Sequence, residues 1–268
     1  MYSTAKSRQS KKLLIMSRVT TKNPWLFMNA LDPRARLYLF CFPYAGGTAQ
    51  VFNSWQAAFP PQTGIQVCPV QYPGRSNRMR EPAFTDCRLL VEAFLPHMIP
   101  LLDKPFALFG HSMGAIVAFE VARALRREGG LKPAHLFVSG RSAPQVPHKE
   151  PYTYNLPDDE FTEELRRLNG TPPEVLEHAE LMQLMLGIIR ADFALTQTYV
   201  YTQEPPLTCP ISVFGGLDDT DVEREDLAPW CKETTSGCSV RIFAGDHFFI
   251  HACEPTVLRT IREELCSY

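Results

Sequence analysis

The chain has 268 residues, of which 45% are hydrophobic, and its formal net charge at pH 7 is -2. This size and apolar content suit one globular domain with an ample core. The near-neutral charge argues against nucleic-acid binding through phosphate contacts, and no apolar run approaches the roughly 18 residues of a membrane-spanning helix. We therefore expect a soluble protein with no nucleic-acid and no membrane partner.

The first segment, residues 1–23, is basic and contains no acidic residue. A transit peptide would have this composition, but we favour a disordered extension, or an upstream start codon with Met16 as the biological start. Residues 24–268 are then expected to form a single domain. The basic side chains of the segment are those of Lys6, Arg8, Lys11, Lys12, Arg18 and Lys22.

From residue 36 onward, short apolar runs alternate with amphipathic stretches. The apolar runs are rich in β-forming residues and end in Gly or Pro, which is typical of buried strands. The alternation predicts an α/β fold, with a mostly parallel sheet flanked by helices and ligands bound at the carboxyl ends of the strands. Expected strands are residues 36–42, 65–70, 106–110, 135–140, 211–216 and 240–245. Expected helices lie near residues 86–102, 115–127, 223–233 and 254–265.

One interval, about residues 145–205, is longer than a simple crossover between strands requires. It has strong helical periodicity and several apolar residues, including Leu181, Leu184 and Ile189. Two interpretations stay open for these residues. They pack as ordinary core, or they form the underside of a helical lid over a substrate channel.

The stretch Gly110-His111-Ser112-Met113-Gly114 stands between an expected strand and an expected helix. In this context Gly-x-Ser-x-Gly forms a sharp turn that lifts the serine hydroxyl above the sheet edge. Side chains larger than hydrogen two residues to either side would clash. Ser112 is therefore the candidate nucleophile.

A serine nucleophile needs a general base and an acid that orients the base, and here the acid should precede the histidine in the chain. His247 follows the last expected strand and is the candidate base, with His251 as its competitor. Asp219 follows the preceding strand, in the spacing Gly-x-x-Asp, and is the candidate acid. Asp218 stays open as an alternative, and Asp246 is a weaker one because neighbours on a loop rarely face each other.

Acyl transfer also needs hydrogen-bond donors for the oxyanion of the tetrahedral intermediate. One is expected to be the backbone N–H of Met113, which follows the nucleophile. The other is expected to be the N–H of Ala45, in the small-residue loop "CFPYAGG" after the first strand. A simple turn is the alternative for that loop.

These motifs resemble those of one family, the type II thioesterases that accompany polyketide and nonribosomal peptide synthetases. The animal medium-chain thioesterases that act with fatty acid synthase belong to the same group. The resemblance spans about Pro24 to Leu265 and is carried by "LFCFPYAGGTAQVFNSW", "VQYPGRSNRMREP", "FALFGHSMGAIVAFEVARAL", "FGGLDDTDV" and "AGDHFFI". It implies an α/β-hydrolase fold with a helical lid and a triad of Ser112, Asp219 and His247. One departure is Tyr44, where many members have His.

The resemblance also implies a substrate and partners. Acyl or aminoacyl groups would be hydrolysed from the phosphopantetheine arm of carrier domains of a polyketide, nonribosomal peptide or fatty acid synthase, in a proofreading or unblocking role. We expect a cytoplasmic monomer with no metal and no cofactor, because the substrate itself carries the phosphopantetheine. The alternatives are a product-releasing thioesterase, a carboxylesterase acting on small esters, and a non-enzymatic module that binds carriers.

Carrier domains are usually acidic, so basic side chains at the rim of the site would favour encounter. The loop "GRSNRMR" supplies Arg75, Arg78 and Arg80 as possible carrier-facing residues. In the alternative interpretation, Arg75 pins the loop by hydrogen bonds and the other two are solvated.

The eight cysteines are scattered and include no Cys-x-x-Cys pair. Several lie in apolar runs, which predicts reduced, buried thiols in a cytosolic protein. They are Cys41, Cys68, Cys87, Cys209, Cys231, Cys238, Cys253 and Cys266.

Overall fold

The computed structural model of the chain describes residues 23–28, 30–170 and 173–266. The expected extension at residues 1–23 therefore lies almost wholly outside the described residues. In the part that is described, no helix is long and apolar enough to cross a membrane.

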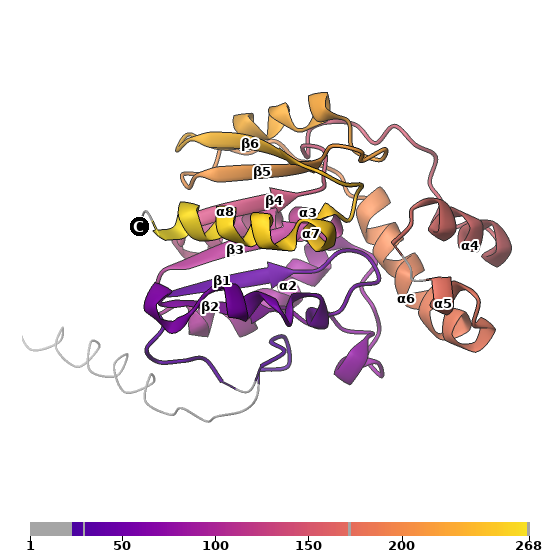
Figure 1. The fold of residues 1–268 in the computed structure, drawn as a ribbon, viewed down its shortest axis with the longest axis horizontal. Coiled ribbons are helices and arrows are strands. Elements are labelled where there is room, and N and C mark those ends of the chain that lie inside the picture. Colours follow the sequence, from indigo (N-terminus) through magenta and orange to yellow (C-terminus); the bar gives the residue numbers. More distant parts are fainter. Residues whose placement is uncertain (1–22, 29, 171–172, 267–268) are drawn as a thin grey trace, which may run out of the picture.

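Six strands form one sheet in the order β2-β1-β3-β4-β5-β6, and all five pairings are parallel (Figure 1). Each expected strand is confirmed within two residues at either end. Five of the six strands are buried along most of their length, as expected for a parallel sheet covered on both faces. The strands are β1 (Leu37–Phe42), β2 (Ile65–Pro69), β3 (Phe106–His111), β4 (His135–Ser139), β5 (Ile211–Gly216) and β6 (Cys238–Phe243).

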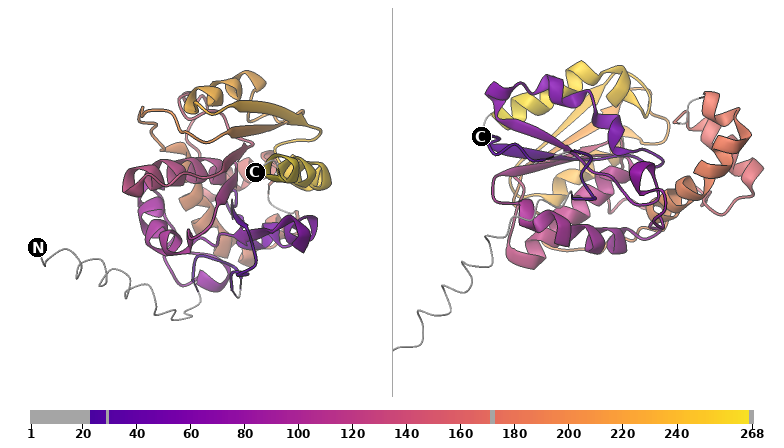
Figure 2. Two further views of the ribbon diagram at one scale, coloured as in Figure 1. Left: turned by 90° about the vertical axis from the view of Figure 1, so that its left-hand side faces the viewer. Right: turned by 90° about the horizontal axis from the view of Figure 1, so that it is seen from below.

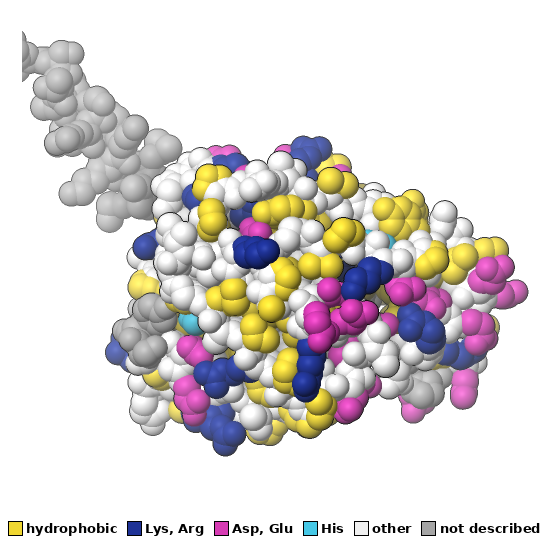
Figure 3. Space-filling view, turned by 90° about the horizontal axis from the view of Figure 1, so that it is seen from above, with side chains coloured by type: hydrophobic (Ala, Val, Ile, Leu, Met, Phe, Trp, Pro, Cys, Tyr) yellow, Lys and Arg dark blue, Asp and Glu magenta, His cyan; other side chains and the backbone are white. Residues whose placement is uncertain are grey.

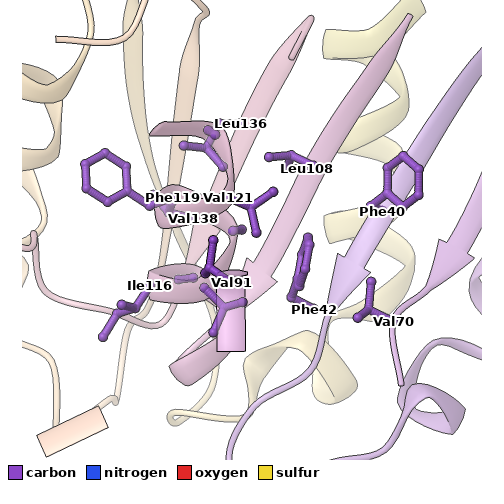
Figure 4. Packing of buried hydrophobic residues seen from close by; sticks show 14 of the residues in the cluster. Phe40, Phe42, Val70, Val91, Leu108, Ile116, Phe119, Val121, Leu136 and Val138 are labelled. Atoms are coloured by element: carbon purple, nitrogen blue, oxygen red, sulfur yellow. The ribbon is translucent and has the colours of Figure 1, made fainter. Parts of the chain in front are cut away.

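Helices cover both faces of this sheet, and successive strand residues point to opposite sides. Tyr38, Phe40 and Phe42 of β1 pack in one core with helices α2 and α3 (Figure 4), while Leu39 and Cys41 pack in the other with α8. Figures 1 and 2 show α7 and α8 on the face opposite α2 and α3. These helices are α2 (Cys87–Met98), α3 (Met113–Gly129), α7 (Phe249–Ala252) and α8 (Glu254–Cys266).

The prediction of a helix at residues 223–233 is wrong. The chain forms two short 3-10 turns there instead, η6 (Arg224–Asp226) and η7 (Ala228–Glu233). Pro229 lies within the second turn, and proline lacks an N–H and disfavours the α conformation of the residue before it. The amphipathic pattern was therefore not sufficient to predict an α-helix.

The described residues of the long interval form three helices. They lie beyond the carboxyl ends of the strands (Figures 1 and 2). We call residues 145–205 the insertion. Part of its apolar surface forms a small core of its own, which includes Phe161, Met182 and Ile189. Leu181 and Leu184, by contrast, are exposed. The helices are α4 (Asp158–Arg167), α5 (Pro173–Leu176) and α6 (Ala179–Gln197).

The expectation that all cysteines are reduced is wrong for one pair. Cys231 of η7 and Cys238 of β6 form a disulfide, because the turn between them brings their Cα atoms to 5.3 Å, a separation that a disulfide can span. The remaining cysteines are free, and Cys41, Cys68, Cys87 and Cys209 are buried as expected.

Candidate active site

Ser112 occupies the tight turn between β3 and α3. Its backbone has φ 54° and ψ -116°, a conformation that residues other than glycine rarely adopt. The Ser112 N–H donates to the Ser139 carbonyl of the neighbouring strand at 2.7 Å, which fixes the turn against the sheet.

The flanking glycines are required by close backbone contacts. A Cβ at Gly110 would lie 2.0 Å from the Gly114 oxygen, and a Cβ at Gly114 would lie 2.1 Å from the Phe42 oxygen. The Gly-x-Ser-x-Gly pattern therefore has the steric cause that was inferred from the sequence.

Asp219 and His247 are joined by a hydrogen bond of 2.9 Å between the aspartate Oδ2 and the histidine Nδ1. The Asp219 side chain has no solvent exposure, and its Oδ1 accepts the N–H groups of Asp221 and Val222 at 2.9 and 3.2 Å. These contacts fix the carboxylate, and the bond at Nδ1 leaves Nε2 of His247 available to another partner.

The alternative candidates for the acid and the base face solvent or have other hydrogen-bond partners. Asp218 is exposed. Asp246 accepts hydrogen bonds from the Phe248 N–H and from Asn169. His251 is bonded to the Tyr44 hydroxyl at 3.1 Å. Of these candidates, only Asp219 contacts His247 through its side chain within the described residues.

Asp219, Asp221 and His247 are also the one group in the described part of the chain whose ligand atoms lie close enough to hold a metal ion, within 4.8 Å of one another. Two of the three are already engaged with each other. The Asp219 carboxylate also accepts two backbone N–H groups, as an orienting acid would. The third member, Asp221, accepts a hydrogen bond from Arg167 Nη1 at 3.3 Å.

The Tyr44–Thr48 loop, between β1 and η1 (Ala49–Phe52), supplies the second expected oxyanion donor. In this loop the Gly46 N–H donates to Asp192 and the Gly47 N–H donates to the Tyr44 carbonyl. The N–H groups of Ala45 and Met113 have no acceptor among the described residues. Both are therefore available to a ligand, as an oxyanion hole requires.

Ser112, His247 and Ala45 line the same cavity, which has a volume of about 550 Å³. The insertion provides much of the remaining wall, through Met185, Ile189 and Phe193 among others. Charged and polar side chains interrupt this apolar lining. They include Arg141, Glu150, Thr153, Glu164, Arg167 and Gln197.

His111, next to the nucleophile, was not singled out from the sequence. It is fully buried, its Nδ1 lies 2.9 Å from the Ser139 hydroxyl, and its ring centre lies 5.3 Å from that of His247. Burial lowers the pKa of His111 well below its ordinary value, and repulsion from His247 and His251 lowers it further. A neutral His111 therefore places no positive charge beside the candidate base.

The possible carrier-facing role of Arg75 and Arg78 is wrong, because both side chains are buried within the chain. The alternative holds for Arg75, which donates hydrogen bonds to neighbouring loops, but not for Arg78, which was expected to be solvated. Arg75 forms a bidentate pair with Asp192, and Arg78 pairs with Glu81 and lies over the Trp25 ring. Arg80 is exposed. On the face drawn in Figure 3, Lys and Arg side chains are interspersed with Asp and Glu, so that face carries no uniformly basic rim.

Asp192, on α6, is the main residue of this region that the sequence analysis missed. Its side chain is buried and contacts both Arg75 and the Tyr44–Thr48 loop. An acidic residue in an otherwise apolar helical stretch was the available signal, since a buried charge requires a partner.

A parallel sheet with helices on both faces, a serine in a strained strand–helix turn and an Asp–His pair at the same edge together define an α/β-hydrolase. The thioesterase domain model matches residues 38–265, and the chain belongs to this thioesterase family of serine hydrolases.

Two curated bacterial proteins are among its relatives. The gramicidin S biosynthesis protein GrsT of Aneurinibacillus migulanus is 42% identical over 93% of this chain and 97% of its own length. LgrE of Brevibacillus parabrevis, named a linear gramicidin dehydrogenase, is 43% identical over 91% of this chain and 93% of its own. The solved type II thioesterase BorB of the borrelidin cluster has a TM-score of 0.82 at 36% identity, covering 90% of this chain and 97% of BorB. Within the family, the chain groups with the type II thioesterases of nonribosomal peptide and polyketide pathways.

Proposed function

We propose that the protein hydrolyses acyl and aminoacyl thioesters on the phosphopantetheine arm of carrier domains, through a triad of Ser112, His247 and Asp219. The observation that carries this proposal is the Asp219–His247 hydrogen bond beside a cavity that Ser112 also lines. Family membership supports the thioester substrate, and the pathways of the relatives support a carrier-bound one.

In the first half of the reaction, His247 takes the proton of the Ser112 hydroxyl as that oxygen attacks the thioester carbonyl. Asp219 holds the imidazole and stabilises its positive charge. The oxyanion accepts hydrogen bonds from the backbone N–H groups of Ala45 and Met113. Because a thiol has an ordinary pKa of about 8.5, the carrier's sulfur leaves readily as a thiolate. The proton held by His247 then passes to that thiolate, which leaves His247 neutral for the second half.

In the second half, water replaces the carrier at the acyl-enzyme. His247 removes a proton from the water, which attacks the ester carbonyl, and the proton passes to the Ser112 oxygen as the acid is released. The chemistry uses side chains and backbone N–H groups of this chain alone, and the phosphopantetheine comes with the substrate.

The proposed role is to unblock carriers that hold unproductive acyl groups. The mixed lining of the cavity supports this, because charged and polar side chains interrupt the apolar surface that one long acyl chain would need. Such a cavity suits several short acyl groups better than a single long product.

Two measurements separate this proposal from its rivals. We expect kcat/KM for acetyl pantetheine to exceed that for its oxygen-ester analogue, whereas a carboxylesterase would favour the oxygen ester. A fluorophosphonate probe should label the wild type and spare Ser112→Ala. Absence of labelling in the wild type would instead support a non-enzymatic carrier-binding module.

A further inference from the structure

One carboxylate of the insertion holds the loop that carries the candidate oxyanion donor. Asp192 Oδ2 accepts the Gly46 N–H at 2.7 Å, and it also accepts Arg75 Nη1 at 2.6 Å. Arg75 Nη2 completes the pair with the other Asp192 oxygen at 2.7 Å. Arg75 Nη1 further donates to the Gly47 carbonyl at 3.2 Å. Two adjacent residues of the loop are therefore fixed by one buried ion pair.

This pair is buried on both sides, with side-chain exposures of 4% for Arg75 and 2% for Asp192. Burial alone would lower the pKa of Arg75, but the attraction of Asp192 outweighs it and raises that pKa above its ordinary value. A buried ion pair contributes little net stability, yet removal of one partner leaves the other charge unpaired. Such an arrangement fixes geometry more effectively than it stabilises the fold.

The same helix restricts the loop at a second point. Gly46 has φ 73°, and a Cβ there would lie 3.3 Å from Ile189 Cγ1. Ile189 and Asp192 are three residues apart on α6 and therefore share one face of the helix. The Gly46 peptide is held between a carboxylate that accepts its N–H and an aliphatic side chain that packs on its Cα.

We propose that Asp192, oriented by Arg75, is a positioning residue that sets the oxyanion hole. By holding the Gly46 peptide, Asp192 would fix the orientation of the neighbouring Ala45 N–H, which has no acceptor among the described residues and is the proposed oxyanion donor. The insertion then helps to build the catalytic centre as well as the cavity wall. The inference rests on the proposed function only in requiring a tetrahedral intermediate at Ser112.

Asp192→Asn tests this inference, because it keeps the size of the side chain but removes the charge that pairs with Arg75. Loss of one oxyanion donor typically lowers kcat by 10²–10³, so a displaced donor should lower it by about 10- to 100-fold. KM should stay within about twofold, since the donor acts mainly in the transition state. A boronic acid that forms a tetrahedral adduct with Ser112 should bind more weakly by a factor similar to the loss in kcat.

Amide hydrogen exchange gives a readout independent of activity. We expect faster exchange across Tyr44–Thr48 in Asp192→Asn and no change in Asp158→Asn. The control weakens the ion pair of Asp158 with Arg190, both of which belong to the insertion and neither of which is bonded to the loop. Should Asp192→Asn fail to fold, Arg75→Lys keeps the charge but loses the bidentate geometry, and it should give the same pattern.

The kinetic assays use p-nitrophenyl acetate beside acetyl pantetheine. A wild type that cleaves the aryl ester but no thioester would contradict the proposed function and still allow the test of Asp192. The inference is overturned if folded Asp192→Asn retains wild-type kcat, boronic acid affinity and loop exchange. A fall in kcat that only matches the loss of folded protein would overturn it equally.

Discussion

Asp218 and Asp219 are adjacent in the sequence, yet the fold gives them opposite environments. The Asp219 side chain is fully buried, accepts two backbone N–H groups and holds His247, whereas Asp218 is exposed. The spacing after β5 favoured Asp219 but could not exclude its neighbour. The difference depends on the loop geometry, which turns one carboxylate toward the His247 loop and the other toward solvent.

This difference gives a matched pair of variants. Asp219→Asn should lower kcat by about 10⁴, because an amide favours the wrong imidazole tautomer and does not stabilise the imidazolium. Asp218→Asn should stay close to wild type. Steady-state kinetics with acetyl pantetheine measures both. Equal losses in the two variants would contradict the assignment of the acid.

At the scale of elements, the strands were predictable because each is a short apolar run that ends near Gly or Pro. The turn at Ser112 was predictable because the pattern Gly-x-Ser-x-Gly is contiguous in the sequence, although Gly114 is also required by the backbone of Phe42 on β1. The Arg75–Asp192 pair was not predictable, because its members lie 117 residues apart and meet only when α6 packs over the sheet edge. The burial of Arg75 likewise depends on this long-range contact, so the loop "GRSNRMR" alone could not decide between a carrier-facing Arg75 and one that pins the loop by hydrogen bonds.

The steric cause of the Ser112 turn can be tested by measuring stability. Gly110→Ala should lower the free energy of unfolding by at least about 3 kcal/mol, because its Cβ would lie 2.0 Å from a backbone oxygen. Gly129→Ala is the control, since a Cβ at that helical position meets nothing within 4 Å. It should be neutral or slightly stabilising. Chemical denaturation compares the two, and similar losses would contradict the steric explanation.

At the scale of the whole molecule, the site is assembled where β1, β3, β5 and β6 end and the insertion begins to cover the sheet (Figure 1). The proposed nucleophile, base, acid and oxyanion loop each follow a different strand. A parallel sheet brings these loops to one edge, which explains why motifs far apart in the sequence line one cavity. The insertion then contributes both the opposite wall and the carboxylate that fixes the oxyanion loop.

The most direct test of the account is intact-mass spectrometry of loaded carrier domains. Carriers that hold acetyl, hexanoyl, decanoyl or aminoacyl groups would be incubated with the wild type and with Ser112→Ala. We predict that short acyl groups are lost from several carriers with the wild type and are retained with Ser112→Ala. Retention of every acyl group by the carriers, alongside rapid cleavage of simple oxygen esters by the same wild-type protein, would contradict the proposed function.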